Sequence, residues 1–402
     1  MSRAPVSCYV GMRNVDKIGK TYWISGIRVV PGPSELDNTY VPEGMPPLDL
    51  GGRSTSYFEF WPMWLMYVPV VLQWLLLSLR YRSLSLPLIA SPAVPLSGMV
   101  GVAKSAVFDV AGPEARDWIL PWMVYEVSAE NPDLQAMMVE AGLGLMKLEL
   151  PVVGKPNIGC RGSGVKLLKT RAELAAYISE FPQGGSIQFQ QLSRWEPEAG
   201  VFYVRHPDTE RGEITSLTLK YTPYVVGDGN STLRQLIARD PRAGELKHLY
   251  QQRHAGNMEQ VIPEGEPYRL VFSASHCRGA VFRDGNQYID SRLVKALDRI
   301  FDDIPGYYYG RLDIKFRDLQ NLQAGYDFEI IEINGASSES IHIWDRNARL
   351  SDAFSALLQQ YSTLFKLGAA NRRRGHKTPG LMALIRAWRY ESNLVKQYPH
   401  ND

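Results

Sequence analysis

The fold is decided by two stretches, YGRLDIKF (309–316) and YDFEIIEIN (326–334), both of which alternate apolar and polar residues as strands do. Side chains two residues apart on a strand share a face, so Glu332 and Asn334 lie together. If the two strands pair, Asp313 joins them. Three oxygen donors on rigid strands suit a hard cation such as Mg²⁺, which takes few carboxylates together with phosphate oxygens. The alternative is a polar sheet face, but the isoleucines beside Glu332 predict a buried strand, where an unpartnered carboxylate is costly.

A second stretch, PVVGKPNIGCRGSGV (151–165), predicts an anion site. An apolar strand carries Lys155 and then opens into a loop in which glycines let backbone amides approach a phosphate closely. The loop contains no GxxxxGK[ST] motif. The alternative reading is a turn whose lysine is merely solvated.

These motifs together resemble the ATP-grasp superfamily, with the closest patterns in D-alanine–D-alanine ligases and in the ligase part of cyanophycin synthetases. The segment VVGDGNSTLRQLI (225–237) also resembles the latter. The resemblance covers residues 98 to 365 and implies an α+β fold in which two subdomains grip ATP.

The resemblance implies a role for each matching residue. Lys104 and Lys155 match the two phosphate-contacting lysines, and Lys155 with Arg311 is implied to be catalytic. Arg311 matches the arginine that steadies the transferred phosphate. The matching metal ligands are Asp313, Glu332 and Asn334. The remaining nucleotide contacts that the resemblance implies are Gly159, Gly162, Ser163, Gly164, Gln190, Gln191, Leu192, Glu198 and Lys220. At Gln190 and Gln191 the family usually has an acidic residue and a lysine.

The implied reaction uses ATP and Mg²⁺. A substrate carboxylate attacks the γ-phosphate, and an amine then displaces phosphate from the acyl phosphate, which gives ADP, phosphate and an amide. Two alternatives stay open: a phosphotransferase that stops at a phosphorylated product, and a membrane-associated nucleotide-binding module without turnover. A P-loop at GMVGVAKS (98–105) is a third reading, but Ala103 stands where that motif needs glycine.

The substrate side departs from the family. The usual N-terminal substrate domain is not visible in residues 1–90, which puts alanine and other small amino acids in doubt. Carboxylate and amine substrates, small or lipid-linked, are expected at polar residues near the metal strand and elsewhere: Arg205, His276, Arg278, Glu339 and His342. Each of the arginines could equally form an internal ion pair, and His342 could be a structural histidine.

The segment FWPMWLMYVPVVLQWLLLSL (60–79) takes the place of that domain. Its 20 residues just reach the length of a membrane span, and Arg80 and Arg82 follow it. Pro62, Pro69 and Gln73 argue against a clean span. A buried core helix, broken near Pro69, and a helix lying in the membrane interface are the other two readings.

The C-terminal stretch 369–402 carries seven Lys and Arg against Glu391 and Asp402. Its apolar residues recur at helical spacing between the basic ones, which favours attraction to an anionic membrane surface. A solvated helix docked on its own domain is the alternative. Together the two segments predict peripheral membrane contact at the inner face of the membrane of a cytoplasmic protein.

Composition sets the outer limits. The chain has 402 residues, 45% hydrophobic and 21% charged, with a net charge of +2, which excludes a disordered polyelectrolyte and gives no case for nucleic acid. The three cysteines, Cys8, Cys160 and Cys277, are too few and too scattered for a disulfide framework or a zinc site. The first residues contain no apolar run, so no secretory signal is expected. The related ligases often dimerise, which makes a homodimer a further expectation.

The pattern divides the chain into four parts: an N-terminal region (1–97), a first ATP-grasp subdomain (98–190), a second (191–368) and a basic tail (369–402). Outside the two deciding stretches, strands are expected at 84–92, 150–156, 186–192, 200–207, 213–221, 269–275 and 279–285. Helices are expected from Lys104 onward and at 133–147, 170–181, 231–240, 291–304 and 352–368.

Overall fold

The computed structural model describes residues 22–24, 27–29, 40–49, 54–59, 61–159 and 162–399. The chain separates into two compact units. The smaller one contains residues 1–41, 46–54 and 224–269, and the larger one contains the rest of the chain. Both sheets that carry the predicted site residues belong to the larger unit. Antiparallel sheets combined with helices confirm the predicted α+β class.

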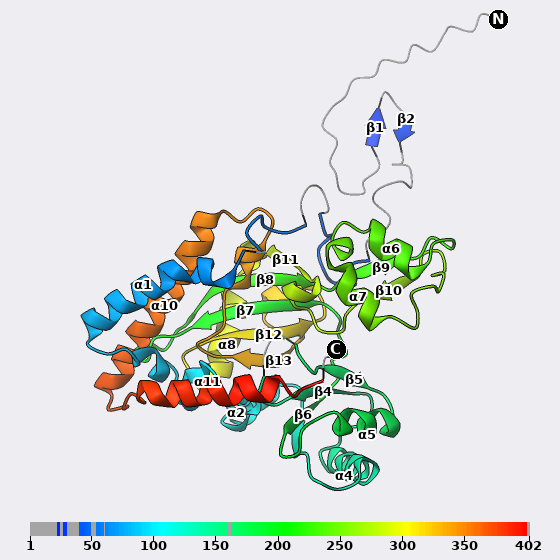
Figure 1. The fold of residues 1–402 in the computed structure, drawn as a ribbon. Helices are drawn as coiled ribbons and strands as arrows, with labels where there is room; N and C mark the ends of the chain where they lie inside the picture. The colour runs from blue at the N-terminus through cyan, green and yellow to red at the C-terminus, as the bar shows by residue number, and fades with distance from the viewer. Residues whose placement is uncertain are drawn as a thin grey trace, which may run out of the picture. The chain divides into compact units, whose positions relative to one another are not determined.

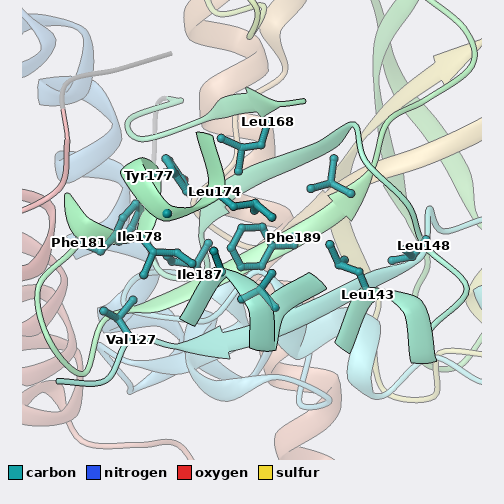
Figure 2. Close-up of a cluster of buried hydrophobic side chains, with 14 of the residues drawn as sticks. Val127, Leu143, Leu148, Leu168, Leu174, Tyr177, Ile178, Phe181, Ile187 and Phe189 are labelled. Atoms are coloured by element: carbon teal, nitrogen blue, oxygen red, sulfur yellow. The ribbon is translucent and has the colours of Figure 1, made fainter. Parts of the chain in front are cut away.

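The first sheet of the larger unit has four antiparallel strands in the order β3-β6-β4-β5. Their bounds are Trp122–Glu126 (β3), Val152–Pro156 (β4), Lys166–Leu168 (β5) and Ser186–Gln191 (β6). Ile187 and Phe189 point to one face and pack under helices α4 (Pro132–Leu145) and α5 (Arg171–Ser179). Figure 2 shows this cluster. The opposite face is left for Lys155 and Gln190.

Three helix starts follow from local sequence. The Thr170 hydroxyl accepts a hydrogen bond from the Glu173 amide and caps α5, as predicted. Lys104 stands at the N-cap of α2 (Ser105–Asp109), so the predicted helix start there is confirmed as well. The short helix α3 (Pro113–Arg116) begins at a proline, whose fixed φ suits the first helical turn.

The second sheet has five antiparallel strands in the order β11-β8-β7-β12-β13. Their bounds are Glu198–Val204 (β7), Glu213–Tyr221 (β8), Val281–Asp284 (β11), Tyr309–Phe316 (β12) and Phe328–Asn334 (β13). Helix α8 (Ser291–Asp302) packs on one face, where the rings of Tyr203 and Phe301 stack with centroids 4.3 Å apart. Helix α9 (Leu319–Ala324) joins β12 to β13.

Two long helices lie beside each other in the larger unit, as Figure 1 shows: α1 (Met63–Tyr81) and α10 (Leu350–Arg373). Met66 and Val70 of α1 are buried, and Trp74 packs edge-on against Phe365 of α10 at 5.3 Å. Helix α1 runs through Pro69 without a break, so the expected break there is wrong. Phe60, the first residue of the apolar segment, lies outside the described residues.

The last helix is α11 (Leu381–Val395). Its Glu391 carboxylate accepts a hydrogen bond from the Gly101 amide at 2.6 Å, and Leu394 and Val395 pack against the core of the first sheet. Tyr398, just beyond it, is buried in the same core. The predicted C-terminal helix is therefore present and docked on its own domain, one of the two readings left open for it.

The smaller unit contains the short hairpin β1 (Tyr22–Ile24) and β2 (Ile27–Val29) and a second pair, β9 (Tyr224–Val226) with β10 (Pro267–Arg269). Helices α6 (Leu233–Arg239) and α7 (Lys247–Arg253) and the 3₁₀ turn η3 (Ala243–Leu246) lie between β9 and β10 in the chain. Thr232 and Gln235 form a capping box at α6, at the helix expected for 231–240.

Two predicted strands are wrong. Residues 84–92 form the 3₁₀ turn η1 (Leu86–Ile89), because Pro87 fixes the backbone at its start, and burial there comes from packing on α10. Only Arg269 of the predicted strand 269–275 is in a strand. The remaining 3₁₀ turns are η2 (Pro95–Gly98), η4 (His276–Arg278), η5 (Asn286–Tyr288) and η6 (Ile341–Trp344).

The core of the first sheet gives a stability prediction. Phe189 is fully buried there, whereas Leu145 at the end of α4 is 87% exposed. Phe189→Ala should lower the free energy of unfolding by about 3–5 kcal/mol, because it removes apolar contacts and leaves a cavity. Leu145→Ala should change it by less than about 0.5 kcal/mol. Urea denaturation of both variants measures the difference, and equal effects would contradict this packing.

Candidate active site

Strands β12 and β13 bring the predicted metal ligands together. Asp313 pairs with Glu332 in the antiparallel register, and Arg311 pairs with Asn334. Cross-strand partners share a face, and residues two apart on one strand do so too, so the four side chains form one cluster. On the other side of Asp313 stands Gly200 of β7, where a Cβ would lie 3.3 Å from the Arg311 side chain. The predicted pairing of the two strands is confirmed.

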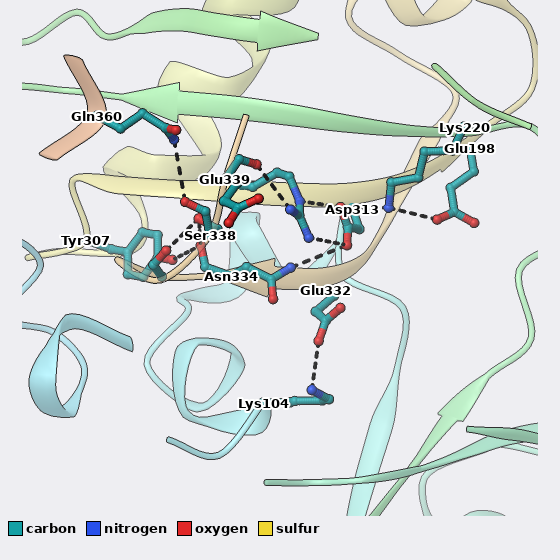
Figure 3. A network of polar contacts seen from close by, with 12 residues as sticks. Lys104, Glu198, Lys220, Tyr307, Asp313, Glu332, Asn334, Ser338, Glu339 and Gln360 are labelled. Atoms are coloured by element: carbon teal, nitrogen blue, oxygen red, sulfur yellow. Dashed lines mark hydrogen bonds and ion pairs between the residues drawn. The ribbon is translucent and has the colours of Figure 1, made fainter. Parts of the chain in front are cut away.

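A chain of buried ion pairs crosses this face (Figure 3). Arg311 grips Asp313 with two nitrogens, Nε at 2.9 Å and Nη2 at 3.2 Å. The Lys220 ammonium lies 2.9 Å from Asp313 and 3.0 Å from Glu198, and Lys315 lies 2.8 Å from the other oxygen of Glu198. Lys220 and its two partners, Asp313 and Glu198, are all buried.

These pairings fix the charges. Burial alone would raise the pKa of Asp313, but Arg311 and Lys220 hold it well below its usual range. Glu198 behaves likewise: burial opposes the charged form, but Lys315 and Lys220 keep its pKa below the ordinary value. Burial lowers the pKa of Lys220, and the two carboxylates reverse that effect, so its pKa is raised. Asp313, Glu198 and Lys220 are therefore ionised near neutral pH.

Lys104 links the two sheets. Its ammonium lies 2.9 Å from the Glu332 carboxylate on β13 and donates to the Gly159 carbonyl in the glycine-rich loop at 2.7 Å. Burial would raise the pKa of Glu332, but Lys104 lowers it overall. Lys104 at the start of α2 thus contacts both Glu332 on β13 and the predicted phosphate loop at Gly159.

Lys155 makes the second link. Its ammonium donates to the Gln190 side chain at 2.8 Å and to the Ile331 carbonyl of β13 at 2.9 Å. Burial, with the nearby charge of Lys104, lowers the pKa of Lys155 to about 8, against the opposing pull of Glu332. Gln190 is buried, whereas Gln191 is exposed and Leu192 is half-buried.

The glycine-rich loop reaches toward the segment 273–278. Gly162 has φ of +71°, in the left-handed region that favours glycine, and a Cβ there would lie 2.9 Å from the Ser273 hydroxyl and 3.6 Å from the Arg278 guanidinium. Gly164, at φ of +70°, accepts a hydrogen bond from the Tyr177 hydroxyl through its carbonyl. Ser163 is half-buried between them, and Cys160 and Arg161 lie outside the described residues.

Three other predicted substrate residues, Arg205, His276 and His342, each contact a different partner. Arg205 forms an ion pair with Asp302 and donates to the Phe301 carbonyl at 3.0 Å, which matches the internal ion pair considered for it. His276 stacks on Trp344 at 5.2 Å. His342 shares a hydrogen bond of 2.8 Å with Ser216, and burial lowers its pKa.

Glu339 lies beside the ion-pair chain. Its carbonyl accepts from Arg311 Nη1 at 3.2 Å, and its carboxylate accepts from the hydroxyl of Tyr67 on α1. The sequence reasoning missed Tyr67, because a tyrosine in an apolar helix gives no sign of which face it points from. Lys315 was also missed, although its spacing from Arg311 and Asp313 places it on their face.

The donor set suits Mg²⁺. Asp313 and Glu332 offer carboxylate oxygens, and Asn334 donates through Nδ2 to Asp313 at 3.4 Å, which leaves its carbonyl oxygen as a ligand. Among the residues that the structure describes, no group of three His, Cys, Asp or Glu side chains could hold a metal ion. A site with two carboxylates, one amide and ligand phosphates is the arrangement that the residues permit.

The charge balance favours an anion. The cations on this face are Lys104, Lys155, Lys220, Arg311 and Lys315, and the carboxylates are Glu198, Asp313, Glu332 and Glu339. The cations exceed the carboxylates by one before any Mg²⁺ is added, which suits a polyphosphate.

Comparison with solved structures finds ligases and synthetases. A bifunctional glutathione synthetase from Pasteurella multocida matches at TM-score 0.32 and 14% identity, over 64% of this chain and 36% of that one. The VanG D-Ala:D-Ser ligase from Enterococcus faecalis matches at TM-score 0.38 and 12% identity, over 68% of this chain and 64% of that one. The D-alanine–D-alanine ligase from Bacillus anthracis matches at TM-score 0.37 and 13% identity, over 70% and 71%.

These three proteins are ATP-grasp ligases, the kind of protein that the sequence motifs resemble. The chain spans 36% and 64% of the length of the first two. No family model and no curated protein matches the chain. Since the TM-scores are all below 0.5, the interpretation of the site rests on its own geometry.

The position of Lys155 predicts a pH dependence of nucleotide binding. A phosphate contact needs the ammonium form, and the pKa of about 8 means that this form is lost as the pH rises through 8. Affinity for ATP should be constant below that pH and fall by about tenfold per pH unit above it. Lys155→Arg should remove this dependence, because arginine stays charged. Calorimetric titration between pH 7 and 9.5 measures it, and a flat profile for the unmodified protein would contradict the assignment.

Proposed function

We propose that the protein is an ATP- and Mg²⁺-dependent carboxylate–amine ligase that forms an amide through an acyl phosphate and releases ADP. The observation that carries the proposal is the meeting of two lysines with the polar cluster of the second sheet. Lys104 from the start of α2 and Lys155 from the first sheet both reach β13, which carries Glu332 beside Asp313 and Arg311. Fixed cations on one side of a polyphosphate and metal-binding carboxylates on the other are what phosphoryl transfer requires.

The proposed roles follow from the contacts. Lys104 and Lys155 neutralise phosphate charge, and amides of the loop at Gly162 and Gly164 face the phosphates. Asp313, Glu332 and Asn334 would hold Mg²⁺, which would supply positive charge to neutralise the phosphate oxygens. Arg311 donates hydrogen bonds to the oxygens of the γ-phosphoryl group while that group is transferred to the substrate carboxylate.

The nucleotide is held at the other end of the site. Gln190, Gln191 and Leu192 border the adenine, and Glu198 and Lys220 lie toward the ribose and the phosphates. The substrate carboxylate and the amine enter on the side of Glu339, the acidic residue nearest to Arg311 among the predicted substrate residues. Arg278 is placed to reach the same region, because it borders the loop at Gly162.

Glu332 tests this function. Glu332→Gln keeps the shape of the side chain but removes the charge, so ADP release should fall by more than the roughly 10- to 100-fold that outer partners of a metal site contribute. The assay measures ADP and phosphate release with ATP, Mg²⁺ and pooled acids and amines. The control is Glu140→Gln, which makes the same change in an ion pair with Arg171 on the helices α4 and α5.

Three outcomes decide between the functions. Release that needs both an acid and an amine supports the ligase. Release without an amine, with a stable phosphorylated product, supports a phosphotransferase instead. Tight ATP binding with no release in any pool contradicts both and leaves a binding module.

We further propose that the enzyme acts at the cytoplasmic face of a membrane. Eight large apolar side chains of α1 are exposed along one continuous face: Trp64, Leu65, Val68, Val71, Leu72, Leu75, Leu76 and Leu79. That face carries no charged residue, and the exposed Arg80 and Arg82 follow it, as suits an anionic lipid surface. Trp64–Tyr81 is long and apolar enough to cross a membrane. Spanning would strip Met66 and Val70 from their core, so surface binding is the proposed mode.

Vesicle flotation tests the membrane proposal. Leu72→Ser, Leu76→Ser and Leu79→Ser together should lower the fraction bound to anionic vesicles at least about tenfold, since a buried leucine contributes about 1.5–3 kcal/mol. The matched control changes Leu134, Met138 and Leu145 of α4, which are also exposed, to serine. An unmodified protein that stays with the soluble fraction, or equal losses in the two variants, would count against this surface.

A further inference from the structure

One residue on the inner face of α1, Tyr67, contacts the proposed active site. The Tyr67 hydroxyl donates to the Glu339 carboxylate, which lies 272 residues further along the chain. Glu339 belongs to the segment 335–340, which follows Asn334 directly at the end of β13. A helix that lies outside both sheets therefore contacts the segment next to the proposed metal ligands.

The contact continues to Arg311. The carbonyl of the same residue, Glu339, accepts a hydrogen bond from Arg311 Nη1 at 3.2 Å, while Nε and Nη2 bind Asp313. Asp313 fixes two nitrogens of the guanidinium, and Glu339 fixes the third. The direction in which the guanidinium points thus depends on where the backbone at Glu339 is held.

The segment 335–340 is held by few other side chains. On its α10 side, the Gln360 carbonyl accepts from the Ser340 amide at 3.3 Å, and Gln360 Nε2 lies 3.5 Å from the Ser338 carbonyl (Figure 3). Within the segment, the Ser338 hydroxyl donates to the Gly335 carbonyl at 2.6 Å. On the α1 side the Tyr67 hydroxyl donates to the Glu339 carboxylate. The Ala336 amide also donates to the Ser97 carbonyl at 2.8 Å, and the Ser337 hydroxyl donates to the Gly98 carbonyl at 3.3 Å. Helices α1 and α10 each add one polar side chain to these contacts.

Tyr67 is suited to act as a constant donor. Its ring meets Tyr361 of α10 edge-on, with centroids 6.4 Å apart. Burial and the charge of Glu339 raise the pKa of Tyr67, and burial raises the pKa of Tyr361 to about 12. The groups that face the Tyr67 hydroxyl are thus one carboxylate and one protonated phenol, and the hydroxyl keeps its proton throughout the working range of pH.

We propose that Tyr67 is a positioning residue for the reaction: through Glu339 it sets the direction of the Arg311 guanidinium toward the transferred phosphoryl group. The proposal rests on the ligase function proposed above. Because Tyr67 stands on the inner face of the helix whose outer face is apolar, α1 is part of the active centre as well as a surface element.

Tyr67→Phe tests the proposal, because it removes one oxygen and keeps the ring packing. We expect kcat to fall about 10- to 100-fold, as for other residues that act through a functional group. The KM and Kd for ATP should stay within about twofold, since Tyr67 contacts no nucleotide-binding residue. Tyr81→Phe is the matched control: it removes a hydroxyl from the same helix, where the ring packs on Phe365, and should leave kcat unchanged.

A double-mutant cycle separates positioning from general packing. Glu339→Ala removes the acceptor and should also lower kcat, and adding Tyr67→Phe to it should cost little more, because both changes remove the same hydrogen bond. Fully additive losses, or a Tyr67→Phe variant with kcat within about twofold of the unmodified protein, would overturn the proposal. So would a loss of kcat matched by equal losses of ATP affinity and thermal stability.

Hydrogen exchange provides a readout that does not depend on turnover. Amide exchange in a peptide covering 335–340 should become at least about threefold faster in Tyr67→Phe and stay unchanged in Tyr81→Phe, because an opened hydrogen bond frees the segment. Unchanged exchange in Tyr67→Phe would overturn the proposal. If the unmodified protein releases no ADP with any acid and amine, the ligase function fails, and this exchange experiment still decides whether Tyr67 holds the segment.

Discussion

The buried carboxylate of Asp313 is the constraint on which the rest of the site depends. An ionised group inside a protein must be paired, and removing one partner of a buried pair costs about 3–5 kcal/mol. Asp313 is paired on both oxygens, by Arg311 from its own strand and by Lys220 from β8. Lys220 in turn needs Glu198, and Glu198 needs Lys315. The order β8-β7-β12-β13 is the one that brings these charges to one face.

The same electrostatics joins the two sheets. Lys104, at the start of α2, contacts the Glu332 carboxylate on β13. Lys155, on β4 of the first sheet, donates to the Ile331 carbonyl of the same strand. These contacts hold cations where burial alone disfavours them, as the lowered pKa of Lys155 records. Phosphates that entered between the sheets would compete for both lysines and would release Glu332 for a metal ion. The contacts of Lys104 and Lys155 with β13 thus join the first sheet and α2 to the second sheet.

Period-2 patterning was sufficient to predict the centre of the site. It placed Glu332 and Asn334 on one face and added Asp313 on the condition that the two strands pair, and the register shows that they do. The same pattern could have added Lys315. It failed at 84–92, because an apolar run is compatible with any buried backbone and the 3₁₀ turn is set by packing on α10. Tyr67 was beyond prediction, since a contact across 272 residues leaves no local signal.

Helix α1 shows why composition alone left three readings of the apolar segment. A buried helix, a surface helix and a span have the same residue types, and they differ only in which faces have partners. In the structure Met66, Val70 and Trp74 have partners on α10 and its neighbours, and the face from Trp64 to Leu79 has none among the described residues. The helix passes through Pro69 because this packing compensates for the hydrogen bond that proline cannot donate. One side of the helix thus packs in the core while the other presents apolar side chains at the surface. Tyr67 lies where the inner side contacts Glu339 in the segment 335–340.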